Sequence, residues 1–211
     1  MKMTSSVRKF ALTAHVIFSV GWLGAVLAYL PLAITGLTSA DAQTVRASYL
    51  SMESIAWFVI LPCCFAALTS GLVQSLGTEW GLFRHYWVLL KFLLTLTGTI
   101  ILLLHMPTIT RVARMAADMT LPIATVGVVH RQLVIHAAGG LLVLLAATIL
   151  SIYKPWGLTP YGRRRMSQSA TASVGASTTS VSWKIYAVLA FIALLILVII
   201  LHLFGGGFPH H

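Results

Sequence analysis

The stretch YWVLLKFLLTLTGTIILLLHM, from Tyr86 to Met106, decides the fold class because it holds one charged residue, Lys91, in an otherwise apolar run. A helix of about 20 such residues is long enough to cross the hydrocarbon core of a bilayer, which is roughly 30 Å thick. Only helices and closed barrels satisfy all their backbone hydrogen bonds in lipid. The stretch therefore predicts a transmembrane helix.

Comparable apolar runs lie on both sides of this one. The chain has 211 residues, of which 58% are hydrophobic and only 9% are charged, whereas soluble domains carry about 25% charged residues. This composition excludes a soluble enzyme and a disordered chain, and two adjacent cysteines cannot form a disulfide framework. We predict an all-α integral membrane protein, a four-helix transmembrane bundle plus a C-terminal fifth transmembrane helix. The other predicted spans are Phe10–Ile34, Tyr49–Val73, Leu133–Tyr153 and Ile185–Phe204.

The chain divides into three parts by composition. Residues 1–157 form the predicted four-helix core, residues 158–182 a cytoplasmic linker that is first basic and then rich in Ser, Thr and Ala, and residues 183–211 the fifth helix and a short tail. Within the core, Pro107–Arg131 is predicted to be an outer connection. Its amphipathic stretch Ile109–Met119 is expected to lie in the membrane interface.

The positive charges indicate how the chain is oriented. The net charge of +10 comes from 14 Lys and Arg against 4 Asp and Glu. If the N-terminus is cytoplasmic, nine Lys and Arg fall on that side and Arg46, Arg111, Arg114 and Arg131 on the other. Because cytoplasmic loops are enriched in Lys and Arg, we predict a bacterial cytoplasmic (inner) membrane protein with N-terminus inside and C-terminus outside. We read the basic excess as this topology signal, and we expect no nucleic-acid partner.

Ionisable residues inside the spans are candidates for function, since burying them in lipid is costly. At 1.5 Å per residue, His15 and Lys91 lie roughly 8 Å from the cytoplasmic edge. His105 and His136 lie roughly 25–29 Å up, near the outer face, and Glu53 falls in that outer layer. We therefore expect one polar pair on the cytoplasmic side and one polar cluster on the outer side.

Haem b is the cofactor that such a bundle holds most naturally. It needs an axial imidazole, small residues beside the porphyrin and cations near the propionates. On the cytoplasmic side, His15 with Lys91 or His85 opposite could hold it, with Arg84 near the propionates. On the outer side, His136 beside Gly139 and Gly140, with His105 opposite, could do the same.

Two other functions stay open. His105, His136 and Glu53 form a possible set of two histidines and one carboxylate for copper or another transition metal, and His15 is a further candidate ligand. A non-catalytic scaffold subunit would need none of these side chains. Apart from the lipid bilayer, the partners left open are a quinone, a redox partner protein and a second copy of the chain. Whether the protein is an enzyme, as a haem-dependent oxidoreductase would be, is also left open.

Several sequence segments carry a resemblance to known families. The segment from Leu12 to Gly24, with His15 and Trp22, resembles the first helix of the copper-resistance D-type membrane proteins, and the segment from Trp80 to Lys91 resembles their Lys-bearing helix. The same elements, with Tyr29-Leu-Pro31, also resemble the membrane-bound, haem-dependent protoporphyrinogen oxidases. That resemblance implies that His15 is a haem ligand and Lys91 a site residue. The segments Gly81–Val88 and Lys154–Gly162 resemble an uncharacterised family of bacterial integral membrane proteins.

Overall fold

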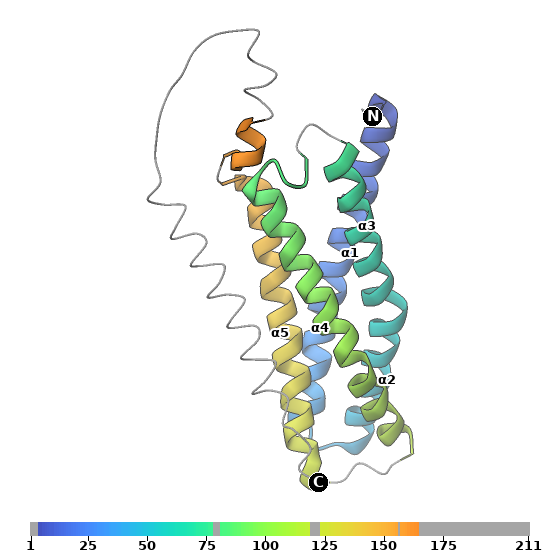
Figure 1. Cartoon of the computed structure of the whole chain (residues 1–211). Helices are drawn as coiled ribbons and strands as arrows, with labels where there is room; N and C mark the ends of the chain where they lie inside the picture. Colours follow the sequence, from blue (N-terminus) through green and yellow to red (C-terminus); the bar gives the residue numbers. More distant parts are fainter. Residues whose placement is uncertain (1–3, 78–80, 119–122, 156, 165–211) are drawn as a thin grey trace.

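The structure, a computed structural model, describes residues 4–77, 81–118, 123–155 and 157–164 (Figure 1). Nearly all of these residues are helical. The elements in chain order are α1 (Ser5–Thr38), α2 (Ala42–Ile55), the π-helical segment η1 (Ala56–Ile60), α3 (Leu61–Gly77), α4 (Tyr86–Ala117) and α5 (Ile123–Tyr153).

The helices form a four-cornered bundle. The elements α2, η1 and α3 follow one another directly and occupy one corner as a single long helix. This helix packs against α1 and α4, and α5 packs against the same two, so α1 and α4 lie on opposite corners. We call the end that carries the start of α1, the start of α4 and the end of α5 the N-terminal end, and the opposite end the far end (Figure 1).

Four helices in the described part of the chain are long and apolar enough to cross a membrane: Ser5–Thr38, Ala42–Gly77, Tyr86–Ala117 and Val129–Tyr153. They contain the four predicted core spans, so the prediction of an all-α, four-span membrane fold is confirmed there. The fifth predicted span, Ile185–Phe204, lies outside the described residues, as does most of the predicted linker. The fold is that of an all-α, multi-pass membrane protein.

The predicted end of the third span at Met106 is wrong. Helix α4 continues through Pro107 to Ala117, and Ile109, Val112 and Ala116 are buried in the main core cluster. A proline interrupts one backbone hydrogen bond, but transmembrane helices tolerate it because neighbouring groups compensate. The stretch expected to lie in the interface is therefore the last part of a bundle helix.

The packing of the bundle is that of a membrane protein. Alanines fill many buried positions, among them Ala33, Ala56 and Ala113, while large apolar side chains such as Phe10, Phe58 and Leu104 are exposed. Small residues let transmembrane helices approach closely, and lipid solvates the large ones. The closest such approach brings Gly36 of α1 against Tyr49 of α2, where an added Cβ would lie 2.8 Å from the tyrosine ring.

Candidate functional site: a histidine pair beside an intramembrane cavity

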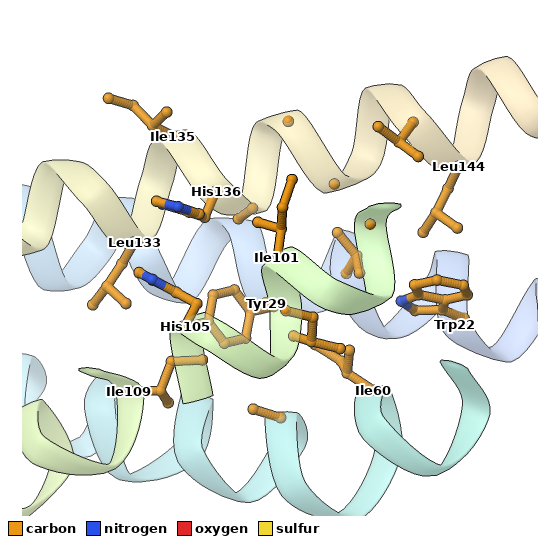
Figure 2. A pocket seen from close by; sticks show the side chains of 18 residues that line it. Trp22, Tyr29, Ile60, Ile101, His105, Ile109, Leu133, Ile135, His136 and Leu144 are labelled. Carbon is orange, nitrogen blue, oxygen red and sulfur yellow. The ribbon is translucent and has the colours of Figure 1, made fainter. Parts of the chain in front are cut away.

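Two histidines from different helices meet inside the bundle. The imidazole of His105 on α4 stacks on that of His136 on α5, with ring centroids 3.9 Å apart and ring planes 12° apart. Figure 2 shows the two rings lying nearly parallel. His105 is buried and His136 is half-buried. The sequence placed these two side chains at similar depth, and the structure brings them into contact.

His136 is held in one tautomer by its own helix. Its Nδ1 lies 2.8 Å from the carbonyl oxygen of Gln132, and a carbonyl can only accept, so Nδ1 carries the proton and donates it. The lone pair of the neutral ring is then on Nε2. Histidines that bind a metal usually donate their other ring N–H in this way, to a carbonyl or carboxylate, which fixes the orientation of the ring.

The histidine pair borders a cavity of about 100 Å³ between α1, η1, α4 and α5, which we call the His-pair cavity. Its walls are mostly apolar. Gly98, Gly139 and Gly140 contribute no side chains to the wall, and a Cβ added at Gly139 or Gly140 would meet nothing within 4 Å. The other lining residues include Trp22, Tyr29, Ile60, Ile101, Leu133 and Leu144 (Figure 2).

Tyr29 adds a polar group to this apolar wall. Its side chain is 5% exposed, and its hydroxyl has no hydrogen-bond partner among the described residues. Leaving such a group buried costs about 1–3 kcal/mol, which a hydrogen bond to a bound molecule would recover. Sequence reasoning singled out Tyr29 only within the resemblance to the oxidases. A usable signal was present, because Trp22 and Tyr29 are two turns apart and therefore share a face of α1.

The side of the cavity that η1 forms has an unusual backbone conformation. Ala56 and Ile60, which line it, are the first and last residues of the π-helical segment η1. Single π-helical turns are rare and are frequently found at functional sites. No pattern in the sequence predicted this π-helical segment.

The two polar residues expected on the cytoplasmic side, His15 and Lys91, lie near the N-terminal end of the bundle, away from the His-pair cavity. His15 Nδ1 donates to the carbonyl oxygen of Ala67 at 3.0 Å and lies 3.1 Å from Ser70 Oγ, which joins α1 to α3. Lys91 Nζ lies 5.9 Å from the centre of the Trp87 ring on its own helix. Neither His15 nor Lys91 lines the His-pair cavity. From Lys91 to His105 the helical rise is about 21 Å.

The remaining candidate residues lie elsewhere. His85 is the N-cap of α4 and forms an antiparallel bridge with Leu158, while Arg84 precedes it in the same loop. Glu53 is in α2, and the described residues contain no group of three His, Cys, Asp or Glu side chains that could hold one metal ion. Glu53 therefore does not complete a three-ligand set with the two histidines in this structure.

Three polar residues lie near the middle of the described helices: Cys64 on α3 and Thr95 and Thr99 on α4. Thr95 and Thr99 each donate their hydroxyl to a carbonyl oxygen of their own helix, at 2.9 and 2.7 Å. Cys64 Sγ lies 3.0 Å from Thr99 Oγ1 and joins α3 to α4. These contacts satisfy the hydroxyl groups locally and hold the two helices together.

No protein-family model, curated protein or solved structure matches the chain. The resemblances to the copper-resistance proteins and to the oxidases therefore stay predictions. Fold and site together define the class as a multi-pass helical membrane protein with a mostly apolar, histidine-bordered cavity inside its bundle.

Proposed function

We propose that this protein binds haem b in the His-pair cavity and serves electron transfer or a haem-linked redox reaction. The observation that supports the proposal most is the orientation of His136, whose Nδ1–H is bonded to the Gln132 carbonyl so that the lone pair of the neutral ring lies on Nε2, the atom that would ligate iron. Haem supplies an iron that cycles between the ferrous and ferric states. The protein's part is to provide the ligand, an apolar surrounding and a fixed orientation.

The number of ligands favours haem over a free metal ion. A porphyrin supplies four of the ligands of its iron, so one or two histidines from the protein are enough. A zinc ion, by contrast, takes at least three ligands from the protein. Two histidines without a third acidic, histidine or cysteine side chain among the described residues match the first case.

The cavity fits haem in chemistry but is smaller than a tetrapyrrole. An apolar cavity of about 150 Å³ takes one benzene ring, and the His-pair cavity is about 100 Å³. Haem binding therefore requires α4 and α5 to move apart. Because positions 98, 139 and 140 are glycines, few side chains would obstruct a porphyrin between these two helices. The exposed side chain of Arg131 lies on α5, five residues before His136, and is available for the propionates.

A second candidate is binding of a single-ring, lipid-soluble molecule such as a quinone head group, which would need less widening of the cavity than haem. Tyr29 supports this alternative, since its buried hydroxyl could donate a hydrogen bond to a quinone carbonyl. A quinone would enter from the bilayer between α4 and α5. The wider setting remains as proposed from the sequence: a bacterial inner membrane, N-terminus inside and C-terminus outside.

Two histidine variants test the haem proposal: His136→Ala and, as a matched control, His15→Ala. We expect purified His136→Ala to lose bound haem and His15→Ala to retain it, with haem measured as its pyridine complex. Loss of bound copper, zinc or iron instead, with haem unchanged, would support the metal-ion alternative. Quinone in a solvent extract of the wild type, lost in Tyr29→Phe, would support the second candidate. A protein with neither haem, metal nor quinone would be a scaffold.

A further inference from the structure

Two loops far apart in the sequence form one folded unit at the N-terminal end of the bundle. The N–H of Thr159 donates to the carbonyl oxygen of Arg84 at 2.9 Å, and its hydroxyl donates to that of Phe83 at 2.6 Å. The N–H of Gly162 in turn donates to Thr159 Oγ1 at 3.0 Å. We name residues 81–85 and 157–162 the loop clasp. It ties the start of α4 to the segment that follows α5.

The loop clasp depends on two glycines. A Cβ added at Gly162 would lie 2.4 Å from the carbonyl oxygen of Arg84, a backbone atom that cannot move aside cheaply. Gly81 has a φ of +55°, where other L-residues are strained. These are the segments that carry the resemblance to the uncharacterised bacterial family, and the structure shows that they pack on each other.

The loop clasp and the residues beside it carry only positive charge within the described part of the chain. Arg84 is half-buried in it, and Lys154, Arg163 and Arg164 are exposed next to it. The described acidic residues, Asp41, Glu53 and Asp118, all belong to the far half of the bundle; Glu79 lies outside the described residues. The described residues of the loop clasp and those beside it therefore present basic side chains on a fixed backbone.

Exposed aromatic side chains accompany these charges. Tyr153 is 77% exposed, Phe83 59% and Tyr161 51%, and all three lie where membrane-spanning helices end. Aromatic rings at such positions sit among lipid head groups. In a bilayer we therefore expect the loop clasp to lie at the level of the phosphates.

We propose that the loop clasp is a binding site for an anionic phospholipid, whose phosphate and negative head group meet Arg163, Arg164 and Lys154. Arginine forms paired hydrogen bonds with phosphate, and basic pockets at the ends of transmembrane helices are known to recognise anionic lipids. Because the clasp holds the loops in place before a lipid arrives, less entropy is lost on binding. This inference does not depend on haem.

The test is native mass spectrometry of the detergent-purified protein titrated with phosphatidylglycerol or with phosphatidylcholine. We expect the wild type to retain phosphatidylglycerol preferentially. The variant Arg163→Gln/Arg164→Gln should bind it about thirtyfold more weakly, since each basic residue contributes about 1 kcal/mol near an anionic surface and 1.4 kcal/mol is a factor of ten. The matched control is Arg111→Gln/Arg114→Gln, which removes two exposed arginines at the far end and should leave binding unchanged.

A second variant tests the role of the fixed loops. Gly162→Ala keeps every charge but forces the two loops apart, so it should also weaken phosphatidylglycerol binding while helix content, measured by circular dichroism, stays the same. The proposal is overturned if the wild type retains both lipids equally, or if the two arginine double variants bind alike. If Gly162→Ala binds phosphatidylglycerol with wild-type affinity, the fixed loops do not contribute to binding and that part of the proposal is overturned.

Discussion

The imidazole of His105 lies face to face with that of His136, with 3.9 Å between the ring centroids. The contact joins α4 to α5 at the edge of the His-pair cavity. Because the rings stack, no porphyrin fits between them in this arrangement, and the two histidines cannot ligate opposite faces of one haem unless they separate. In the proposed haem complex His136, with its Nδ1 already bonded, would be the ligand, and His105, which packs on its face, would hold it in position.

Filling the cavity should abolish haem binding without unfolding the protein. A side chain at Gly140 meets no atom within 4 Å of its Cβ, so Gly140→Leu should fold and place its side chain in the slot. We expect haem content to fall at least tenfold at unchanged helix content. Gly24→Leu is the matched control, since Gly24 also faces open space but does not line the cavity. Equal haem in both variants would mean that haem binds elsewhere.

Removing His15 should affect stability and not the cofactor. His15→Ala removes the hydrogen bond from Nδ1 to the Ala67 carbonyl, and it leaves that carbonyl in a half-buried contact between α1 and α3. We expect a loss on the order of 1 kcal/mol in the free energy of unfolding, measured by thermal denaturation in detergent. A loss of haem in this variant would indicate that haem binds at the N-terminal end through His15, as the resemblance to the oxidases implies.

The contact between Gly36 and Tyr49 should be the most sensitive glycine position in the bundle core. An alanine at position 36 would place its Cβ 2.8–2.9 Å from three atoms of the tyrosine side chain. Overpacking of this kind costs about 1–3 kcal/mol, so Gly36→Ala should lower the unfolding temperature. Gly24→Ala, in open space, should leave it unchanged. Equal unfolding temperatures for the two variants would show that α1 and α2 can shift apart freely.

The start of α2 should respond to pH through Asp41. Its carboxylate caps the helix by accepting from the N–H of Thr44 at 2.9 Å and from the Thr44 hydroxyl, and these bonds hold the pKa of Asp41 below its usual value. A lowered folded-state pKa means that the stabilisation is present above the unfolded-state pKa and is lost as the pH falls through the folded-state value. The unfolding temperature of the wild type should therefore drop in acid more than that of Asp41→Asn. Identical pH profiles would contradict the cap.

The fold could be predicted from the sequence because the bilayer imposes one simple rule on it. An apolar run such as Tyr86–Met106 has to be a helix in lipid, and all four core spans follow from that rule. The end of α4 could not be predicted in the same way. Pro107 looks like a helix terminator, but the residues that follow it, such as Ile109 and Val112, are buried by packing against other helices, and only the assembled bundle reveals this.

The candidate site could be predicted in part. Helical rise alone placed His105 and His136 at one depth, and the structure brings them together. Their stacking depends on the rotation of α4 and α5, and the cavity depends on side chains that are absent at positions 98, 139 and 140. Neither the stacking nor the cavity can be predicted from the sequence of a single helix. The loop clasp likewise joins Phe83 to Thr159, which are 76 positions apart.

The central claim is tested most directly by the absorption spectrum of the detergent-purified protein from haem-replete cells, recorded oxidised and then after reduction with dithionite. The account predicts a Soret band with sharp α and β bands on reduction, all of them lost in His136→Ala and retained in His15→Ala. A colourless wild-type protein, or a spectrum that His136→Ala leaves unchanged, would contradict it.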